Sequence, residues 1–229
     1  MKTRSQYHAQ LQKLKQKLDL LGNLSRKSLE LACAFTKTGH AEYLDELAVN
    51  DQESMQEKNA VDHLAMTLLL REQPVAAELR YVASAMKIAQ SMNRITRQAA
   101  EAAEIFDTPA LPEERFTPMM EEMMQIVLQM VSEANESLFV QDCHMALEVM
   151  NNDDEVDRRF ETIKSQLIEG LRKEQIHPEA AVDLLMISKY LERIADHAFK
   201  IAKWSCFIQS GKTYREEELK AMLQNNRTD

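Results

Sequence analysis

Apolar residues recur at every third or fourth position along most of this chain, and this periodicity is the feature that most limits its fold. The first such series lies near the N-terminus and comprises Leu11, Leu14, Leu18, Leu21, Leu24, Ser28, Leu31 and Phe35. This spacing places side chains on one face of an α-helix, whereas a half-buried strand needs a spacing of two. Only 4 glycines and 5 prolines interrupt the 229 residues. The pattern therefore predicts an all-α protein.

Breaks in the periodicity divide the chain into six expected helices, at residues 4–37, 41–72, 74–106, 117–140, 142–174 and 178–210. Gly39 and Gly211 follow the first and the last of them, where a left-handed C-terminal cap favours glycine. We expect Pro74, Pro118 and Pro178 in the first turn of a helix, because an N–H group there has no partner to lose. Helices of about 30 residues are roughly 45 Å long, which predicts an elongated bundle.

A short proline-containing stretch, Asp107–Pro112, divides the chain into two similar halves. Each half contains three expected helices, and Ser91–Arg97 in the first is similar to Tyr190–Asp196 in the second. We therefore expect two tandem three-helix bundles related by pseudo-symmetry. Their predicted limits are residues 1–108 and 113–229.

Composition and charge narrow the possible partners and compartment. The net charge of −9 disfavours nucleic acid as a partner. No apolar run approaches the ~20 residues of a membrane-spanning helix, and Met1–Tyr7 is too polar for a signal peptide. Cys33, Cys143 and Cys206 have neither metal-type nor disulfide-type spacing, so free thiols in a reducing compartment are expected. These features predict a soluble cytoplasmic protein.

Four carboxylates are expected to converge across the last helical hairpin. Asp153 and Asp157 are four residues apart on one helix, and Glu192 and Asp196 are four apart on the next, so each pair shares a helix face. At about 100° per residue, both pairs lie on the same flank of their apolar stripes and at similar distances from the turn. Carboxylates gathered in one place repel unless a cation neutralises them. The pattern predicts a metal site, with iron, zinc, manganese or magnesium as candidates, and a solvated acidic face as the alternative.

The equivalent positions of the first half carry different chemistry. Asp51 and Met55 occupy the places of the first acidic pair, and Asn93 and Arg97 occupy those of the second. Arg97 would bring a fixed positive charge to the place of a metal ion. We expect an Arg97–Asp51 ion pair, an anion attracted to Arg97, or an exposed arginine without a role.

Other candidate groups are assigned structural roles. Glu174 and His177 have the spacing of a di-iron ligand pair, but they span a turn and cannot both face one bundle core. We expect His197 at the surface, and Arg80 next to Glu78 as a solvated charge pair. No nucleophile elbow, phosphate-binding loop, zinc spacing or dinucleotide fingerprint occurs, which argues against an enzyme. Core packing is the expected role of a methionine cluster comprising Met119, Met120, Met123, Met124 and Met130.

Three segments resemble the PhoU family of phosphate-uptake regulators. Arg71–Arg80 resembles the "RQPVA-DLR" segment of that family, Leu191–His197 its "LERIGDH", and Asp153–Asp157 its acidic "DDEVD". The resemblance covers nearly the whole chain, in the same order and spacing. It implies two pseudo-symmetric three-helix bundles, metal clusters at E-x-x-x-D motifs, and a regulatory role. Members of the family are thought to link a phosphate ABC transporter to a membrane histidine kinase.

The first-repeat replacements limit what this resemblance implies. Because Asn93 and Arg97 replace both acids of the motif, at most one metal site carries over, formed by Asp153, Asp157, Glu192 and Asp196.

We expect a non-enzymatic regulator of phosphate uptake and phosphate-starvation signalling, and by family analogy a homodimer that is peripheral to the membrane at most. Its expected partners are the transporter ATPase, the sensor histidine kinase or both. The alternatives are a diverged paralogue that serves another transporter, a carboxylate-bundle metal protein, and a metal-free helical scaffold.

Overall fold

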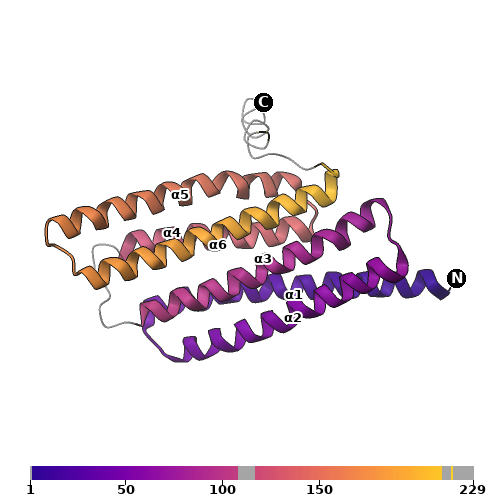
Figure 1. The fold of residues 1–229 in the computed structure, drawn as a ribbon, viewed down its shortest axis with the longest axis horizontal. Coiled ribbons are helices and arrows are strands. Elements are labelled where there is room, and N and C mark those ends of the chain that lie inside the picture. The colour runs from indigo at the N-terminus through magenta and orange to yellow at the C-terminus, as the bar shows by residue number, and fades with distance from the viewer. Residues whose placement is uncertain (1, 108–116, 213–217, 219–229) are drawn as a thin grey trace.

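The computed structural model describes residues 2–107, 117–212 and 218 and contains six α-helices (Figure 1). They are α1 (Lys2–Thr38), α2 (Glu42–Glu72), α3 (Ala76–Phe106), α4 (Thr117–Phe139), α5 (Cys143–Arg172) and α6 (Pro178–Ser210). The predicted all-α class is confirmed. The prolines of the predicted linker lie outside the described residues, so the expected limits of the two halves stay predictions.

The helices form two three-helix bundles that lie side by side. Helices α1, α2 and α3 pack on one another, and α5 and α6 pack on each other and on α4. The bundles meet where α3 packs on α6 and α1 packs on α4, which leaves α2 and α5 at the outer edges. The α2–α3 turn lies at the end of the molecule where α6 finishes, and the α5–α6 turn lies at the opposite end (Figure 1). The expected pseudo-symmetric pair of tandem bundles is therefore observed.

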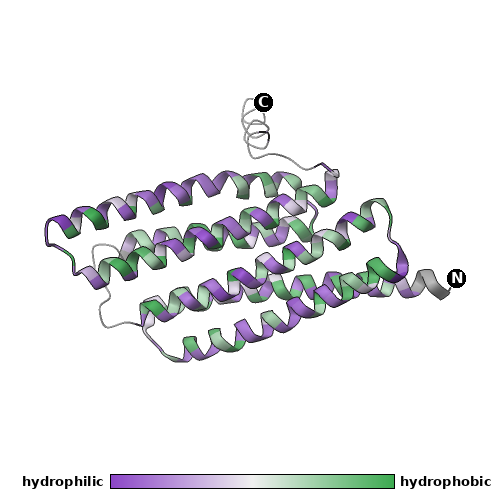
Figure 2. Ribbon diagram, viewed as in Figure 1, coloured by the Kyte–Doolittle hydropathy of each residue, from purple (hydrophilic) through white to green (hydrophobic). Residues whose placement is uncertain are grey.

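One hydrophobic core runs through both bundles. Leu14, Leu18 and Leu21 of the first periodic series are fully buried. Apolar and polar residues alternate along every helix, as expected for amphipathic helices with one buried and one solvent-exposed face (Figure 2). None of the described helices is long and apolar enough to cross a membrane. Core positions are confirmed for four members of the methionine cluster: Met120, Met123, Met124 and Met130.

The ends of the helices agree in part with the expected caps. Gly211 adopts a left-handed conformation with φ of 70° directly after α6, and Pro178 lies in the first turn of that helix, as predicted. The expected place of Pro74 is wrong by two residues, because α3 begins at Ala76. Gln73 and Ala76 have φ of 46° and 49°, and these two left-handed residues keep Pro74 within the turn.

Gly22 allows α1 and α4 to approach closely at the contact between the bundles. A Cβ atom at this position would lie 3.3 Å from Asn135 Cγ and 3.5 Å from Met92 Cε. The buried Asn135 amide donates hydrogen bonds to Gly22 O at 3.0 Å and to Ser25 Oγ at 3.2 Å. The glycine thus makes room for a polar link that joins the two bundles.

Arg80 provides a second link between the bundles. Its Nε donates a hydrogen bond to Ile208 O near the end of α6, at 3.3 Å. The expected solvated pair with Glu78 is therefore wrong, because Glu78 interacts instead with Tyr7 of α1. The arginine satisfies a carbonyl at the end of α6, where the helix itself supplies no N–H donor.

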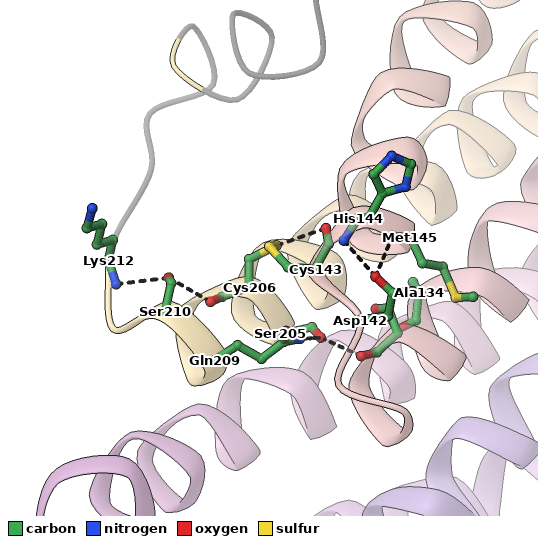
Figure 3. The surroundings of a disulfide bond; sticks show 11 residues. Ala134, Asp142, Cys143, His144, Met145, Ser205, Cys206, Gln209, Ser210 and Lys212 are labelled. Carbon is green, nitrogen blue, oxygen red and sulfur yellow. Dashed lines mark hydrogen bonds between the residues drawn. A yellow bond between two sulfur atoms is a disulfide. The ribbon is translucent and has the colours of Figure 1, made fainter. Parts of the chain in front are cut away.

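A disulfide joins Cys143 to Cys206, and their Cα atoms are 5.0 Å apart (Figure 3). The prediction of free thiols is wrong for this pair and right for Cys33, which is free and buried. The two half-cystines are 63 residues apart in sequence. Only the packing of α5 on α6 brings them together, so sequence spacing could not reveal the bond.

Replacement of Gly22 by leucine should destabilise the protein. The added side chain would have to displace Asn135 and Met92 from a packed contact, which costs about 1–3 kcal/mol in well-packed cores. Urea unfolding of Gly22→Leu beside wild type measures this loss. The neighbouring Asn23 is exposed, so Asn23→Leu is the matched control and should change the free energy of unfolding by less than about 0.5 kcal/mol. Equal stabilities of the two variants would contradict the close α1–α4 approach.

Candidate functional site

The acidic residues of the last hairpin lie beside the interface of α5 and α6. Val156 of α5 and Leu191 of α6 are buried in that interface. The flanking positions are more exposed to solvent: the Glu192 side chain is 17 % exposed and that of Asp196 is 52 % exposed. The expected position of the acids at the edge of the apolar stripe therefore agrees with the structure.

Asp157, one of the four predicted ligands, interacts electrostatically with two others, Glu192 and Asp196. Burial raises the pKa of Asp157, and the negative charges of Glu192, Asp196 and Asp154 raise it further. The carboxylate of Asp157 on α5 thus lies within electrostatic reach of Glu192 and Asp196 on α6. Asp153 lies one helical turn before Asp157 on α5.

The described part of the chain contains no group of three or more His, Cys, Asp or Glu side chains that could hold a metal ion. Lysine side chains of α6 partner two of the predicted ligands. Lys189 Nζ lies 2.6 Å from Glu192 Oε2, and Lys200 Nζ lies 4.0 Å from Asp196 Oδ2. The four-carboxylate metal centre stays a prediction.

Lys189 is the residue of this site that the sequence reasoning missed. Its ammonium group also lies over the ring of Phe160, 5.0 Å from the ring centroid, and it lowers the pKa of Asp157 against the effect of burial. The signal was present in the sequence as a lysine three residues before Glu192, a spacing at which helical side chains meet. Lys189 therefore neutralises part of the charge that a metal ion would neutralise.

The first-repeat counterpart has no such cluster. Arg97 Nε donates a hydrogen bond to Glu101 Oε1 at 2.9 Å, one turn along α3, and its side chain is half exposed. Burial raises the pKa of Asp51, and the positive charge of Arg97 partly offsets this rise. Of the three expected outcomes, the Arg97–Asp51 interaction is present as an attraction between the two charges, whereas the close ion-pair partner of Arg97 is Glu101 in the same helix.

Neutral hydrogen bonds take the place of the missing first-repeat acids. Asn93 Nδ2 donates to Ser54 Oγ at 3.1 Å, between α3 and α2. One turn away, Asn50 Nδ2 donates to Ser28 Oγ at 2.6 Å and to Leu24 O at 2.8 Å. These amide and hydroxyl groups satisfy one another without a cation, whereas the neighbouring Asp51 Oδ1 is buried and accepts no hydrogen bond from the described residues.

His197 of α6, expected at the surface, is partly buried and lies near Arg94 of α3. Burial lowers its pKa to about 4, and the positive charges of Lys200 and Arg94 contribute to the shift. Its Nδ1 atom is buried without a hydrogen-bond partner. The expectation failed because it considered only the hairpin of α5 and α6, whereas α6 also packs along α3 of the other bundle.

Comparison with known proteins identifies the family of this chain. The sequence profile described as "PhoU domain" matches residues 18–106 and 120–205, once in each three-helix bundle. These two matches cover well over half of the chain. The chain belongs to the PhoU domain family, as the resemblance of its motifs implied.

Curated relatives and solved structures agree with this assignment. The phosphate-specific transport system accessory protein PhoU homolog 1 of Methanothermobacter thermautotrophicus is 29 % identical over 80 % of this chain and 90 % of its own length. The PhoU homolog of Pseudomonas aeruginosa is 27 % identical over 97 % of this chain and 94 % of its own length.

Two crystal structures share the fold. The match to PhoU from Pseudomonas aeruginosa has a TM-score of 0.86 at 24 % identity and covers 90 % of this chain and all of that one. The match to the phosphate transport system regulatory protein PhoU from Streptococcus pneumoniae has a TM-score of 0.81 at 21 % identity. It covers 91 % of this chain and 99 % of that one.

The partly buried His197 should make stability depend on pH. Its pKa is lower in the folded protein than in the unfolded chain, so its contribution is complete above about pH 6.5 and is lost as the pH falls towards 4. Between pH 7 and pH 5 this effect amounts to about 1–2 kcal/mol. Urea unfolding at both pH values should show this loss in wild type and a smaller one in His197→Leu.

His63 is exposed on α2, so His63→Leu is the control and should retain the wild-type difference between pH 7 and pH 5. The same pH dependence in wild type and His197→Leu would contradict the partial burial of a neutral histidine at this position.

Proposed function

We propose that this chain is a cytoplasmic, non-enzymatic regulator of phosphate uptake and of phosphate-starvation signalling. The observation that supports this role most directly is the occurrence of the PhoU domain twice, over nearly all of the helical chain. The curated relatives are named accessory proteins of the phosphate-specific transport system. The sequence contains no catalytic motif, which fits a protein that acts by binding other proteins.

The regulator acts as an adaptor between the ATPase of a phosphate ABC transporter and a membrane sensor histidine kinase. Exposed apolar side chains at the ends of the molecule suit such contacts. Leu70 and Val75, beside the α2–α3 turn, are 76 % and 71 % exposed, and Leu171 and Val182 are exposed beside the α5–α6 turn. A homodimer is also part of this proposal.

A carboxylate metal site in the second bundle completes the proposal. Asp153, Asp157, Glu192 and Asp196 offer only oxygen ligands, which suit hard cations such as magnesium, manganese or ferric iron. Burial raises the pKa of Asp157, and the negative charges of Glu192 and Asp196 raise it further, which supports an excess of negative charge there. A bound cation, which could also be zinc, would replace Lys189 beside Glu192 and hold α5 against α6.

Two alternative functions are supported to different degrees. Action on a different transporter, as a diverged paralogue, is favoured by the altered first-repeat surface, where Arg97 and Met55 replace the family's acidic and polar residues. A carboxylate-bundle enzyme or metal store is disfavoured, because Glu174 and His177 lie in the turn between α5 and α6. Their side chains therefore cannot form the inward-facing ligand pair that such a centre needs.

Capture of partners from host cells tests the regulatory role. The tagged full chain, cross-linked in cells grown with ample phosphate, should recover a transporter ATPase, a sensor histidine kinase or both. The double variant Leu70→Asp/Val75→Asp should reduce recovery about tenfold, because it charges an apolar contact. Val49, 65 % exposed on α2, gives the control Val49→Asp, which should bind as wild type does. Recovery of neither partner at high or low phosphate would refute the role.

Titration with manganese tests the metal site. Glu192→Ala/Asp196→Ala should weaken binding about tenfold or more, because it removes two charged ligands. Lys189→Met should strengthen binding about tenfold, because the ion no longer displaces an ammonium group. Lys164 also lies over Phe160 but pairs with Glu161, so Lys164→Met is the matched control and should bind manganese as wild type does. Identical titrations for all four proteins would exclude the site.

A further inference from the structure

The disulfide ties the beginning of α5 to the end of α6 (Figure 3). Cys143 is the first residue of α5, directly after Asp142, whose side chain accepts hydrogen bonds from His144 N and Met145 N. Cys206 lies on α6, five residues before Gly211, the residue that caps this helix. The bond therefore closes the open end of the α5–α6 hairpin, opposite the turn that joins the two helices.

The two sulfur atoms differ in access and in chemistry. Cys206 is 1 % exposed, whereas Cys143 is only partly buried. Unpaired N–H groups at a helix N-terminus stabilise a thiolate, and the thiolate is the reactive form of cysteine. Cys143 is thus the member of the pair that an external thiol or disulfide can reach and attack.

The end of α6 that this bond holds is also a contact between the bundles. Within the second bundle, Ser205 next to Cys206 donates a hydrogen bond from its Oγ to Ser137 O of α4, at 3.0 Å. The contact between the bundles is made two residues after Cys206, where Ile208 O accepts the hydrogen bond from Arg80 of α3. Greater mobility of this end of α6 would therefore also loosen the contact with the start of α3.

A cavity of about 270 Å³ lies at the same place, where the end of α6 meets α1 and α3. Lys15, Arg80, Gln141 and Ile208 are among the residues that line it. Movement of the last turn of α6 would change the shape of this cavity and the position of the Arg80 guanidinium group.

We propose that Cys143 and Cys206 form a reversible redox clasp that sets how firmly the end of α6 is held against α3. To close it, the Cys143 thiolate attacks a low-molecular-weight disulfide, forms a mixed disulfide and releases one thiol. The Cys206 thiolate then attacks Cys143 Sγ, forms the protein disulfide and releases the second thiol.

Two electrons pass from the cysteines to the small disulfide, and the two cysteine protons end on the two released thiols. Opening is the reverse exchange, with a low-molecular-weight thiol as the reductant. This redox role goes beyond the phosphate-transport role proposed above and does not depend on it.

Thiol counting and hydrogen exchange on the purified full chain test the clasp. Alkylation followed by mass spectrometry should count three free thiols after dithiothreitol and one, at Cys33, after oxidised glutathione. Amides of residues 205–210 and 76–81 should exchange about tenfold faster in the reduced protein, because loss of the disulfide lowers the free energy of local opening. The reduced protein should also melt roughly 5–10 °C lower.

Cys143→Ser should show the reduced exchange pattern with or without oxidant, and Cys33→Ser, the control, should switch as wild type does. If Cys143→Ser does not fold, the comparison of reduced with oxidised wild-type protein provides the same test. Three free thiols after full oxidation, or equal exchange of both segments in the two redox states, would overturn the clasp.

Discussion

The antiparallel packing of α3 on α6 is the interaction on which the rest of the structure depends. Each of these helices buries one part of its surface in its own bundle and another part against the other bundle, so its buried face is broader than a single apolar stripe. Small side chains occupy much of that face and permit close approach of the two helices. The alanines concerned are Ala85, Ala89, Ala99, Ala103, Ala195, Ala198 and Ala202. The same packing brings Glu101 to Tyr190 and Arg94 to His197, so that the electrostatic environment of each repeat is partly set by the other.

Within this symmetric frame the two repeats balance their polar groups in different ways. The second repeat gathers Asp157, Glu192 and Asp196 and offsets their charge with lysines of α6. In the first repeat, neutral amide and hydroxyl groups take the equivalent places and link α3 to α2 and α2 to α1. The proposed cation site is therefore confined to the second bundle. The altered surface of the other bundle lacks this excess of carboxylates.

The sequence was sufficient wherever the outcome depended on one helix or one hairpin. Periodicity located the six helices and the buried methionines, and the spacing of Asp157, Glu192 and Asp196 placed these acids together across the last turn. The expectations that failed depend on neighbours from elsewhere in the chain. His197 is partly buried near Arg94 of α3, Arg80 bonds to the end of α6, and Cys143 meets Cys206 through packing over 63 residues of sequence. A helical wheel describes one helix and carries no information about such neighbours. Lys189 is different, because its proximity to Glu192 was visible in the sequence and was not considered.

The central claim is that one repeat has kept a cation site and the other has lost it. Anomalous diffraction at the manganese edge, from crystals of the reduced protein soaked in manganese, tests this claim most directly. The account predicts one anomalous peak between α5 and α6, within coordination distance of Glu192 and Asp196, with the Lys189 side chain displaced. It predicts no peak beside Arg97. A map without a peak at the last hairpin, in which Lys189 still contacts Glu192 at saturating manganese, would contradict it, as would a peak in the first repeat.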